Sequence, residues 1–302
     1  MIIGEIFLNI YMVKEIHEFI APVKIIDCKA VLNERFLIDN AINQVPLGGK
    51  EYTSLNPDGY ILLDYGKEFS GGIRLLTQCV KSKNSSARIR IRFGESVTEA
   101  SSELGEKNSG NHHSTRDFIC NTQNLSEIRL GSTGFRFIRI DNLDDCEIGI
   151  LSVQAEFVHS GAVASGKFEC NDSKINEIFL TAERTVFLNM QNGVLWDGVK
   201  RDRLVWSGDL YVEMLSCFYI YGNVENIKNS LDMCLINARN NNGWVNRIPA
   251  YSFWLILNVA DYCRLSGDYD YVKKLYGFIE DLTEKLNICI SDDGIFNPLS
   301  LG

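Results

Sequence analysis

The stretch from Trp196 to Glu213 concentrates the side chains of this chain that could do acid–base chemistry. It reads W-D-G-V-K-R-D-R-L-V-W-S-G-D-L-Y-V-E, with three bases and two tryptophans among its eighteen positions. Its four acids are Asp197, Asp202, Asp209 and Glu213. Because Gly198 and Gly208 interrupt the stretch, we expect the acids to lie on a loop between two helices.

This combination favours hydrolysis of a glycosidic bond. That reaction needs one carboxylic acid to protonate the leaving oxygen and a second carboxylate to activate water or to attack. Arginines keep neighbouring acids ionised, whereas apolar walls such as Trp206 favour the protonated form. The alternative interpretation is a charged loop between helices, whose Asp–Arg pairs are surface salt bridges that contribute little stability.

The sequence D-G-V-K-R-D-R-L-V-W-S-G-D-L resembles the signature loop of the family 78 α-L-rhamnosidases, whose commoner form is D-x-P-x-R-D-E-R-L-G-W-T-G-D. Three further pieces resemble the β-sandwich that precedes the catalytic domain in that family: L-L-D-Y-G-K-E-F-S-G-G, R-I-R-I-R-F-G-E-S and T-G-F-R-F-I-R-I. The resemblance runs from about residue 60 to the last residue.

Composition indicates an ordinary globular protein with room for two domains. The chain has 302 residues, 45% of them hydrophobic. Its net charge of −9 argues against a nucleic-acid or anionic-membrane partner. No C-x-x-C pair occurs among the nine scattered cysteines, so we expect no metal site and a reduced, cytoplasmic protein. The first residues lack a basic leader and a cleavage site, and no apolar run has transmembrane length.

The first half of the chain has the alternation of β-strands. We leave residues 1–22 as an uncertain N-terminal extension and assign 23–160 to a β-sandwich of jelly-roll type. Strands are expected at residues 60–65, 71–80, 87–93 and 134–140, with Asn56-Pro-Asp-Gly as a turn before the first of them. Residues 98–114 are polar and are predicted to form a long surface loop.

The second half, residues 165–302, has helical periodicity. Five helices are predicted, the first capped by Asp172 and the second beginning near Ser207–Asp209. By the resemblance they are the start of the (α/α)6 barrel that catalyses the reaction in this family. Such a barrel has twelve helices, so the resemblance implies a C-terminally truncated, incomplete barrel, completed, if at all, by a missing C-terminal half or by an oligomer.

The resemblance also assigns roles to residues. Asp202 is our choice for the general acid, although the missing Glu after R-D leaves open that Asp202 matches the preceding Asp of the motif instead. Asp197 and Asp209 match the aspartates that hold the sugar hydroxyls. Glu213, one turn after Asp209, is an alternative acid or a solvated residue of the first turn. The remaining substrate-binding candidates are Arg201, Arg203, Trp206 and Trp254.

Other tempting residues have plainer interpretations. We interpret Glu95 as half of a structural ion pair, and His112 and His113 as parts of a solvated loop. Trp244 and Trp254 fit core packing slightly better than a sugar platform. The arginines of strand 87–93 are expected to be solvated or to pair with acids of a neighbouring strand.

The sequence therefore predicts an α-L-rhamnosidase-like glycoside hydrolase that acts, without metal or cofactor, on terminal α-L-rhamnosides by inversion. The base that activates water belongs to the later half of the barrel in this family, and no residue here matches it. The alternative is a non-catalytic carbohydrate-binding or remnant protein that lacks this base.

Overall fold

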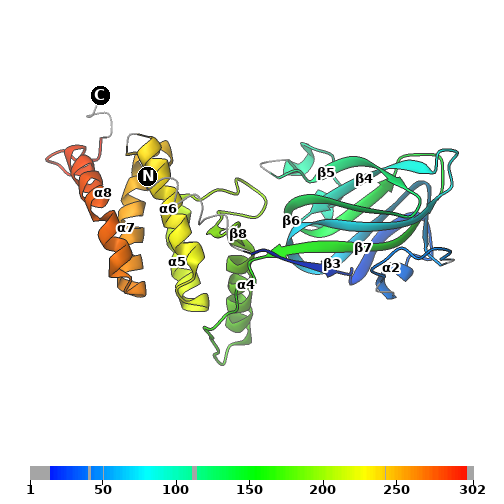
Figure 1. Ribbon diagram of the computed structural model, residues 1–302, viewed down its shortest axis with the longest axis horizontal. Coiled ribbons are helices and arrows are strands. Elements are labelled where there is room, and N and C mark those ends of the chain that lie inside the picture. The colour runs from blue at the N-terminus through cyan, green and yellow to red at the C-terminus, as the bar shows by residue number, and fades with distance from the viewer. Residues whose placement is uncertain (1–13, 40–41, 50, 111–113, 242, 298–302) are drawn as a thin grey trace. The chain divides into compact units, whose positions relative to one another are not determined.

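The computed structural model describes residues 14–39, 42–49, 51–110, 114–241 and 243–297 (Figure 1). The chain divides into two compact units. One joins Ile16–His159 with the short segment Val199–Asp202, and we call it the sheet unit. The other, the helical unit, holds Ser160–Gly198 and the described residues from Arg203 onward. A β domain followed by a helical domain was predicted, and this fold class is confirmed.

The sheet unit is built on one seven-stranded antiparallel sheet in the order β1-β7-β3-β6-β4-β5, with β2 also paired to β3. Its strands are β1 Ile16–Ile20, β2 Lys24–Leu32, β3 Thr53–Val80, β4 Ser86–Gly94, β5 Asp117–Gln123, β6 Ser126–Asn142 and β7 Ile148–His159. The strand β1 pairs with β7. The sheet therefore begins inside the segment that we had left as an N-terminal extension.

The turn signals of the sequence mark bends within strands rather than chain reversals. The predicted strands 60–65 and 71–80 are one 28-residue strand, β3, which also includes Asn56-Pro-Asp-Gly. Its pairing with β6 shifts register twice, between Asp64 and Phe69 and again between Gly71 and Ile73. Such irregularities bend a strand without ending it. At Gly71 the close approach of Glu156 O, only 1.9 Å from where a Cβ would lie, excludes any side chain.

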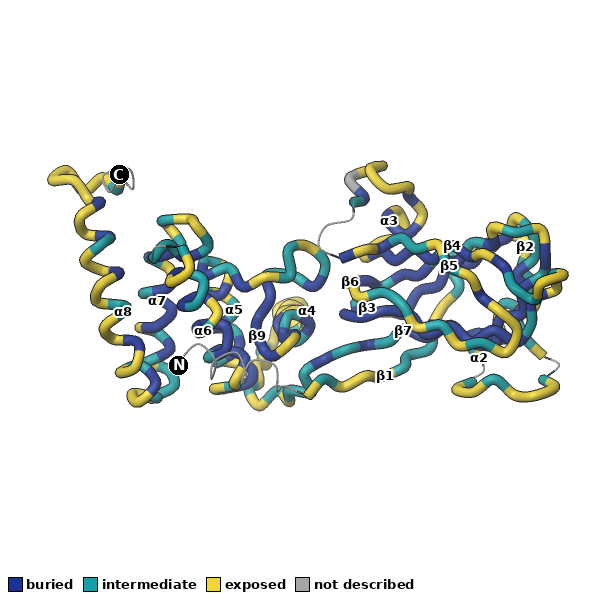
Figure 2. The backbone as a smooth tube through the Cα atoms, turned by 45° about the horizontal axis from the view of Figure 1, so that its top comes forward, coloured by how far each residue is buried: buried dark blue, intermediate teal, exposed yellow. Residues whose placement is uncertain are grey.

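The sheet core follows the predicted alternation. On β4, Ile89, Ile91 and Phe93 are fully buried. The arginines of the other face pair with acids of both neighbouring strands: Arg90 contacts Asp117 of β5 at 2.6 Å and Arg92 contacts Asp141 of β6 at 2.8 Å. In Figure 2 long runs of buried residues lie along β3 and β7.

The predicted surface loop 98–114 contains more structure than expected. It begins with helix α3, Val97–Ser101, and continues with a 3-10 turn, η1, at Glu106–Asn108. Ser96 caps α3 by accepting the Glu99 N–H. Glu99 and Ala100 are buried, which composition did not suggest. A short helix, α2, at Phe36–Asp39 also belongs to this unit.

The five predicted helices are all present in the helical unit. They are α4 Ser173–Asn189, α5 Ser207–Tyr221, α6 Glu225–Asn240, α7 Pro249–Ser266 and α8 Tyr269–Ile288. The Asp172 carboxylate accepts the N–H groups of Lys174 and Ile175, as expected of a cap. A two-stranded hairpin, β8 Met190–Gln191 and β9 Val194–Leu195, and a 3-10 turn, η2 Val245–Arg247, complete the unit.

Helix α5 lies at the centre of the helical packing. It contacts α4, α6 and α7, and α7 in turn contacts α8. Leu210, Met214 and Cys217 repeat at helical spacing on α5 and are fully buried. Figure 2 shows that α4 and α8, by contrast, are exposed along much of their length. Helix α5 therefore belongs to a well-packed core, and its first two turns carry Asp209 and Glu213 of the acid-rich stretch.

Candidate active site

The acid-rich stretch is introduced by the β8–β9 hairpin. Asn192 and Gly193 have φ of +50° and +75°, the backbone that a two-residue Asn-Gly turn requires. The hairpin is buried from Gly193 to Trp196. It ends the helix pattern of α4 and sends the chain into the loop before α5.

Polar side chains of α6 fasten this hairpin. Asn226 and Asn229 donate their amide N–H groups to Val194 O and Gly193 O, at 3.2 and 2.9 Å. The Ser230 hydroxyl accepts the Leu195 N–H at 2.8 Å. All three α6 side chains are buried. Their spacing on an otherwise apolar helix face was a signal in the sequence that our interpretation did not use.

Asp197 closes the base of the loop that follows. Its Oδ1 accepts the Leu204 N–H at 2.9 Å, and its own N–H donates to Leu204 O at 3.0 Å. Arg203 lies beside this closure with its guanidinium 4.4 Å from the centre of the Trp196 ring. Burial lowers the pKa of Arg203 from its ordinary value. Thus Asp197 and Arg203, both predicted site residues, also shape the loop.

The tip of the loop, Val199–Asp202, belongs to the sheet unit. Val199 is buried there, and Ser114 donates its hydroxyl to Lys200 O at 2.7 Å. The Lys200 ammonium lies 2.5 Å from Glu99 Oε1 and 3.2 Å from Glu95 Oε2. The interpretation of Glu95 as half of a structural ion pair is therefore confirmed. Asp202 is half-buried and Arg201 is exposed.

Helix α7 fixes the start of α5. The Ser207 hydroxyl donates to Tyr251 O at 2.7 Å, and the Asn258 amide donates to Ser207 O at 2.8 Å. Gly208 allows this approach, since a Cβ there would lie 3.2 Å from the Tyr251 ring and 3.4 Å from Trp254. Trp206, at the N-cap position, meets Tyr251 edge to face at 5.9 Å.

The structure brings Asp197, Asp209 and Glu213 into one electrostatic cluster. Burial, and then the negative charges of Asp209 and Asp197, raise the pKa of Glu213 to about 8. The same two aspartates, after burial, raise the pKa of Tyr251. Glu213 is therefore protonated at neutral pH, within the electrostatic influence of two aspartates. A neutral carboxylic acid in such surroundings can give a proton.

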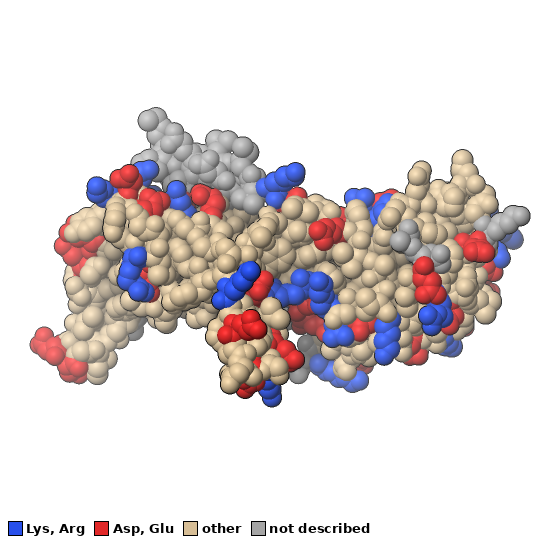
Figure 3. Space-filling view, turned by 90° about the horizontal axis from the view of Figure 1, so that it is seen from below, with Lys and Arg blue, Asp and Glu red and all other residues tan. Residues whose placement is uncertain are grey.

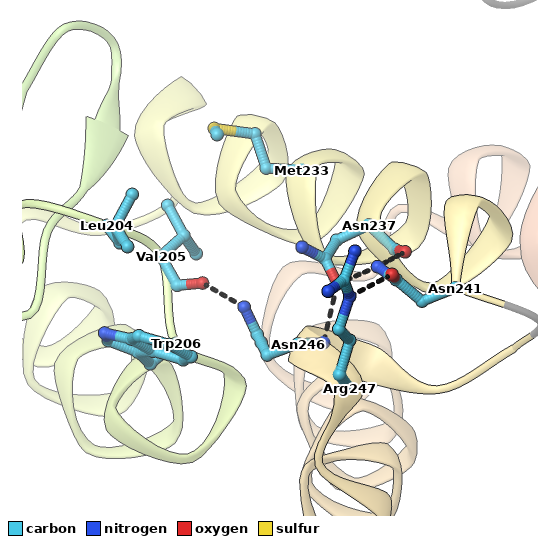
Figure 4. Close-up of a pocket in the computed structure, with 8 residues that line it drawn as sticks. All are labelled: Leu204, Val205, Trp206, Met233, Asn237, Asn241, Asn246 and Arg247. Carbon is cyan, nitrogen blue, oxygen red and sulfur yellow. Dashed lines mark hydrogen bonds between the residues drawn. The ribbon is translucent and has the colours of Figure 1, made fainter.

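A pocket of about 350 Å³ lies next to Trp206 (Figure 4). Leu204, Val205, Trp206 and Met233 form its apolar side. Its polar side consists of three asparagine amides and one guanidinium, from Asn237, Asn241, Asn246 and Arg247. These residues come from the loop before α5, from the C-terminal half of α6 and from η2, so the pocket is contained within the helical unit.

The remaining predicted residues fall in different places. Trp254 is partly exposed and packs 5.1 Å from Tyr211 on the contact between α5 and α7. Trp244 packs against the helical core. His112 and His113 lie outside the described residues. Tyr251, Asn258 and the polar pocket side chains were not predicted, because nothing in their spacing links them to the loop.

Among the described residues, no group of three or more His, Cys, Asp or Glu side chains is placed to hold a metal ion. None of the helices described is both long enough and apolar enough to span a bilayer. The nine cysteines, all within the described ranges, are free thiols. On the face drawn in Figure 3, basic and acidic side chains are interspersed.

Each half of the chain matches the model of a known protein domain. Residues 54–159 match the model of the bacterial α-L-rhamnosidase concanavalin-like domain. Residues 164–282 match the bacterial α-L-rhamnosidase six-hairpin glycosidase domain. No sequence among curated proteins matches the chain significantly.

Solved structures share the fold at low identity. A rhamnosidase from Klebsiella oxytoca with rhamnose bound is 17% identical, with a TM-score of 0.74 over 97% of this chain and 60% of its own. A family 78 rhamnosidase from Bacillus sp. GL1 is 19% identical, with a TM-score of 0.67 over 87% of this chain and 28% of its own. The chain thus spans less than two thirds of the length of each of these two proteins.

The two matched domains define a class, the glycoside hydrolases that place a concanavalin-like domain before a six-hairpin helical domain. Within that class, the chain belongs to the α-L-rhamnosidases of family 78. The predicted family is therefore confirmed.

Proposed function

We propose that this protein hydrolyses terminal α-L-rhamnosides. The observation that carries the proposal is the cluster at the start of α5, where Glu213 is held protonated beside Asp197 and Asp209. The family of the chain gives the sugar, since the Klebsiella relative was solved with rhamnose bound. We expect a cytoplasmic enzyme that needs no metal or cofactor.

The carboxyl groups of the cluster are suited to two different roles. The neutral Glu213 is suited to donate its proton to the leaving glycosidic oxygen, and its pKa near 8 keeps that proton available up to mildly alkaline pH. Asp209, exposed in the first turn of α5, is suited to accept hydrogen bonds from sugar hydroxyls. Trp206 supplies an apolar ring face for the C–H side of the sugar.

The signature motif supports a different donor, Asp202. Its segment is held by the Lys200 ion pairs of the sheet unit, whereas Glu213 lies on α5 in the helical unit. We favour Glu213 because its protonation near neutral pH follows from its surroundings. Asp202 remains the competing assignment, and variants of the two residues separate them.

The family reaction inverts the anomeric centre, which requires a base about 6.5–9.5 Å from the acid. The motif assigns no residue of this chain to that role. We propose that a second copy of this chain supplies it. If this base is absent, the protein binds rhamnosides without cleaving them, which is the second candidate function.

The proposal is tested with the purified chain and an aryl α-L-rhamnoside. We expect release of the phenol, and first-formed β-rhamnose in the NMR spectrum. Asp209→Asn should lower kcat/KM by about 10- to 100-fold, because charge-assisted hydrogen bonds contribute about 1.5–3 kcal/mol. Asp270→Asn, at the exposed start of α8, is the matched control. Full activity of Asp209→Asn would contradict the site assignment, and saturable binding of rhamnose without turnover would identify the second function.

A further inference from the structure

The pocket beside Trp206 has the two-sided character of a sugar subsite. Its volume of about 350 Å³ lies at the small end of the usual range for ligand pockets, about 300–1,000 Å³. One side is apolar and includes the Trp206 ring, and the other presents amide groups. A pyranose has the same division, with C–H faces and hydroxyl edges. The size suits a single ring.

The polar side of the pocket is held in place by its own hydrogen bonds (Figure 4). Asn237 Oδ1 accepts the Asn246 N–H at 2.6 Å, and Asn241 donates to Asn237 O at 2.7 Å. Asn241 Oδ1 in turn accepts the Arg247 Nε–H at 2.8 Å. The guanidinium is therefore oriented through Nε, and its two terminal nitrogens keep their donor capacity for a ligand.

Charge decides which sugar fits this pocket. Arg247 is the one charged residue among those that line it. No ion pair joins Arg247 to a carboxylate of the described residues. A guanidinium pairs with a carboxylate through two parallel hydrogen bonds, a geometry that a neutral hydroxymethyl group cannot reproduce.

Trp206 connects this pocket to the acid cluster. The ring lines the pocket, and it packs against Tyr251, whose pKa is raised in part by Asp209 and Asp197. A sugar unit in the pocket would therefore neighbour the sugar held by the cluster.

We infer that the pocket binds a uronic acid, a pyranose with a carboxylate, through Arg247. This inference deepens the proposed function and rests on it only in one respect: the uronate would be the unit next to the cleaved rhamnose. Rhamnosides attached to a uronate would then be the preferred substrates.

The binding test compares galacturonate with galactose, which differ only by a carboxylate in place of a hydroxymethyl group. Calorimetric titration of the wild-type chain at low salt should give at least about ten-fold tighter binding of galacturonate. Arg247→Gln should abolish this preference, and Arg247→Lys should keep part of it, which separates loss of charge from misfolding. Arg239→Gln is the matched control. Arg239 is exposed in the last turn of α6 and does not line the pocket, so this variant should keep the preference.

Two results with the wild-type chain would overturn the inference. One is equal affinity of the wild type for galacturonate and galactose. The other is acetate binding as tightly as galacturonate, because the site would then recognise charge without a sugar ring. An unchanged galacturonate preference in a folded Arg247→Gln variant would also overturn the inference, because the carboxylate would then bind at another site.

The outcomes separate this inference from the proposed function. Arg247-dependent galacturonate binding by a chain that cleaves no aryl rhamnoside supports the uronate pocket and contradicts the proposed activity. Cleavage of aryl rhamnosides by a chain that binds galacturonate no better than galactose supports the activity and contradicts the pocket. If both hold, kcat/KM should be at least ten-fold higher for a rhamnosyl-uronate than for the matching rhamnosyl-hexose, and Arg247→Gln should remove that ratio.

Discussion

At the scale of residues, the chemistry depends on where Glu213 is buried. The sequence places Glu213 one turn after Asp209, and that spacing predicts a shared helix face. It does not predict a protonated carboxyl group, because the pKa shift arises from burial among segments far apart in the chain. The Asp172 cap was predictable, because it depends only on residues that lie next to it in the sequence.

Glu213 should make stability depend on pH. Its pKa is about 8 in the folded chain against an ordinary 4.5, so between these values the folded state holds a proton that the unfolded state releases. The free energy of unfolding should therefore fall as pH rises from 4.5 to 8. Glu213→Gln removes this loss and should be more stable than wild type at pH 9, by about 4–5 kcal/mol at about 1.4 kcal/mol per pKa unit, and equal at pH 4.

Thermal melts of both proteins across this range measure the effect. Glu225→Gln, at the exposed start of α6, is the control and should follow the wild type. A stability difference between Glu213→Gln and wild type that does not vary with pH would contradict the raised pKa.

At the scale of elements, the periodicity of apolar residues predicted the helices and strands better than the turn-forming residues did. Five helices were predicted because their apolar residues repeat at helical spacing and their ends carry caps. The long strand β3 was predicted as two short ones, because Asn56-Pro-Asp-Gly and Gly66 indicated turns. In β3 and β6 the sheet accommodates such residues as irregularities in pairing, a choice made by the neighbouring strands rather than by local sequence.

The loop tip on the sheet unit depends on one buried ion pair. Glu99 is 8% exposed, and Lys200 is the cation that neutralises it. Lys200→Met should destabilise the sheet unit by about 3 kcal/mol, since it leaves a buried carboxylate without a cation. Adding Glu99→Gln should restore much of the loss, because the uncompensated charge is removed.

Chemical denaturation followed by circular dichroism measures these changes. Lys83→Met, an exposed lysine after β3, provides the comparison and should have little effect. If Lys200→Met is as stable as Lys83→Met, the ion pair does not hold the segment.

At the scale of the whole molecule, the helical unit carries exposed apolar side chains that could contact another protein surface. Large side chains are solvent-exposed on several helices, among them Ile178 at 60% on α4 and Val212 at 65% and Tyr219 at 73% on α5. Exposed apolar side chains promote association where they adjoin one another. The sequence predicted it through the incomplete set of barrel helices, whereas the identity of what covers these residues is not encoded in their pattern.

Dye binding and self-association should both detect the exposed apolar side chains of the helical unit. The wild-type chain is expected to bind a hydrophobic dye such as ANS and to self-associate in light scattering. The double substitution Val212→Glu with Tyr219→Lys should reduce both signals severalfold without loss of helicity. Leu47→Lys, at an 89% exposed apolar residue of the sheet unit, is the control. A wild-type chain that is monomeric and does not bind the dye would contradict the expectation.

The most direct test of the proposed activity is the pH dependence of kcat/KM with two rhamnosides, one with a nitrophenyl and one with a methyl leaving group. Nitrophenolate leaves with little protonation, whereas methoxide needs a proton from the acid. If Glu213 is the donor, activity on the methyl rhamnoside falls above about pH 8, and Glu213→Gln lowers it by about 100-fold or more while sparing the nitrophenyl substrate. If Asp202→Asn gives that pattern and Glu213→Gln leaves the profile unchanged, the motif position is the acid and our assignment is wrong. Folded wild-type protein that cleaves neither substrate would contradict the proposed activity itself.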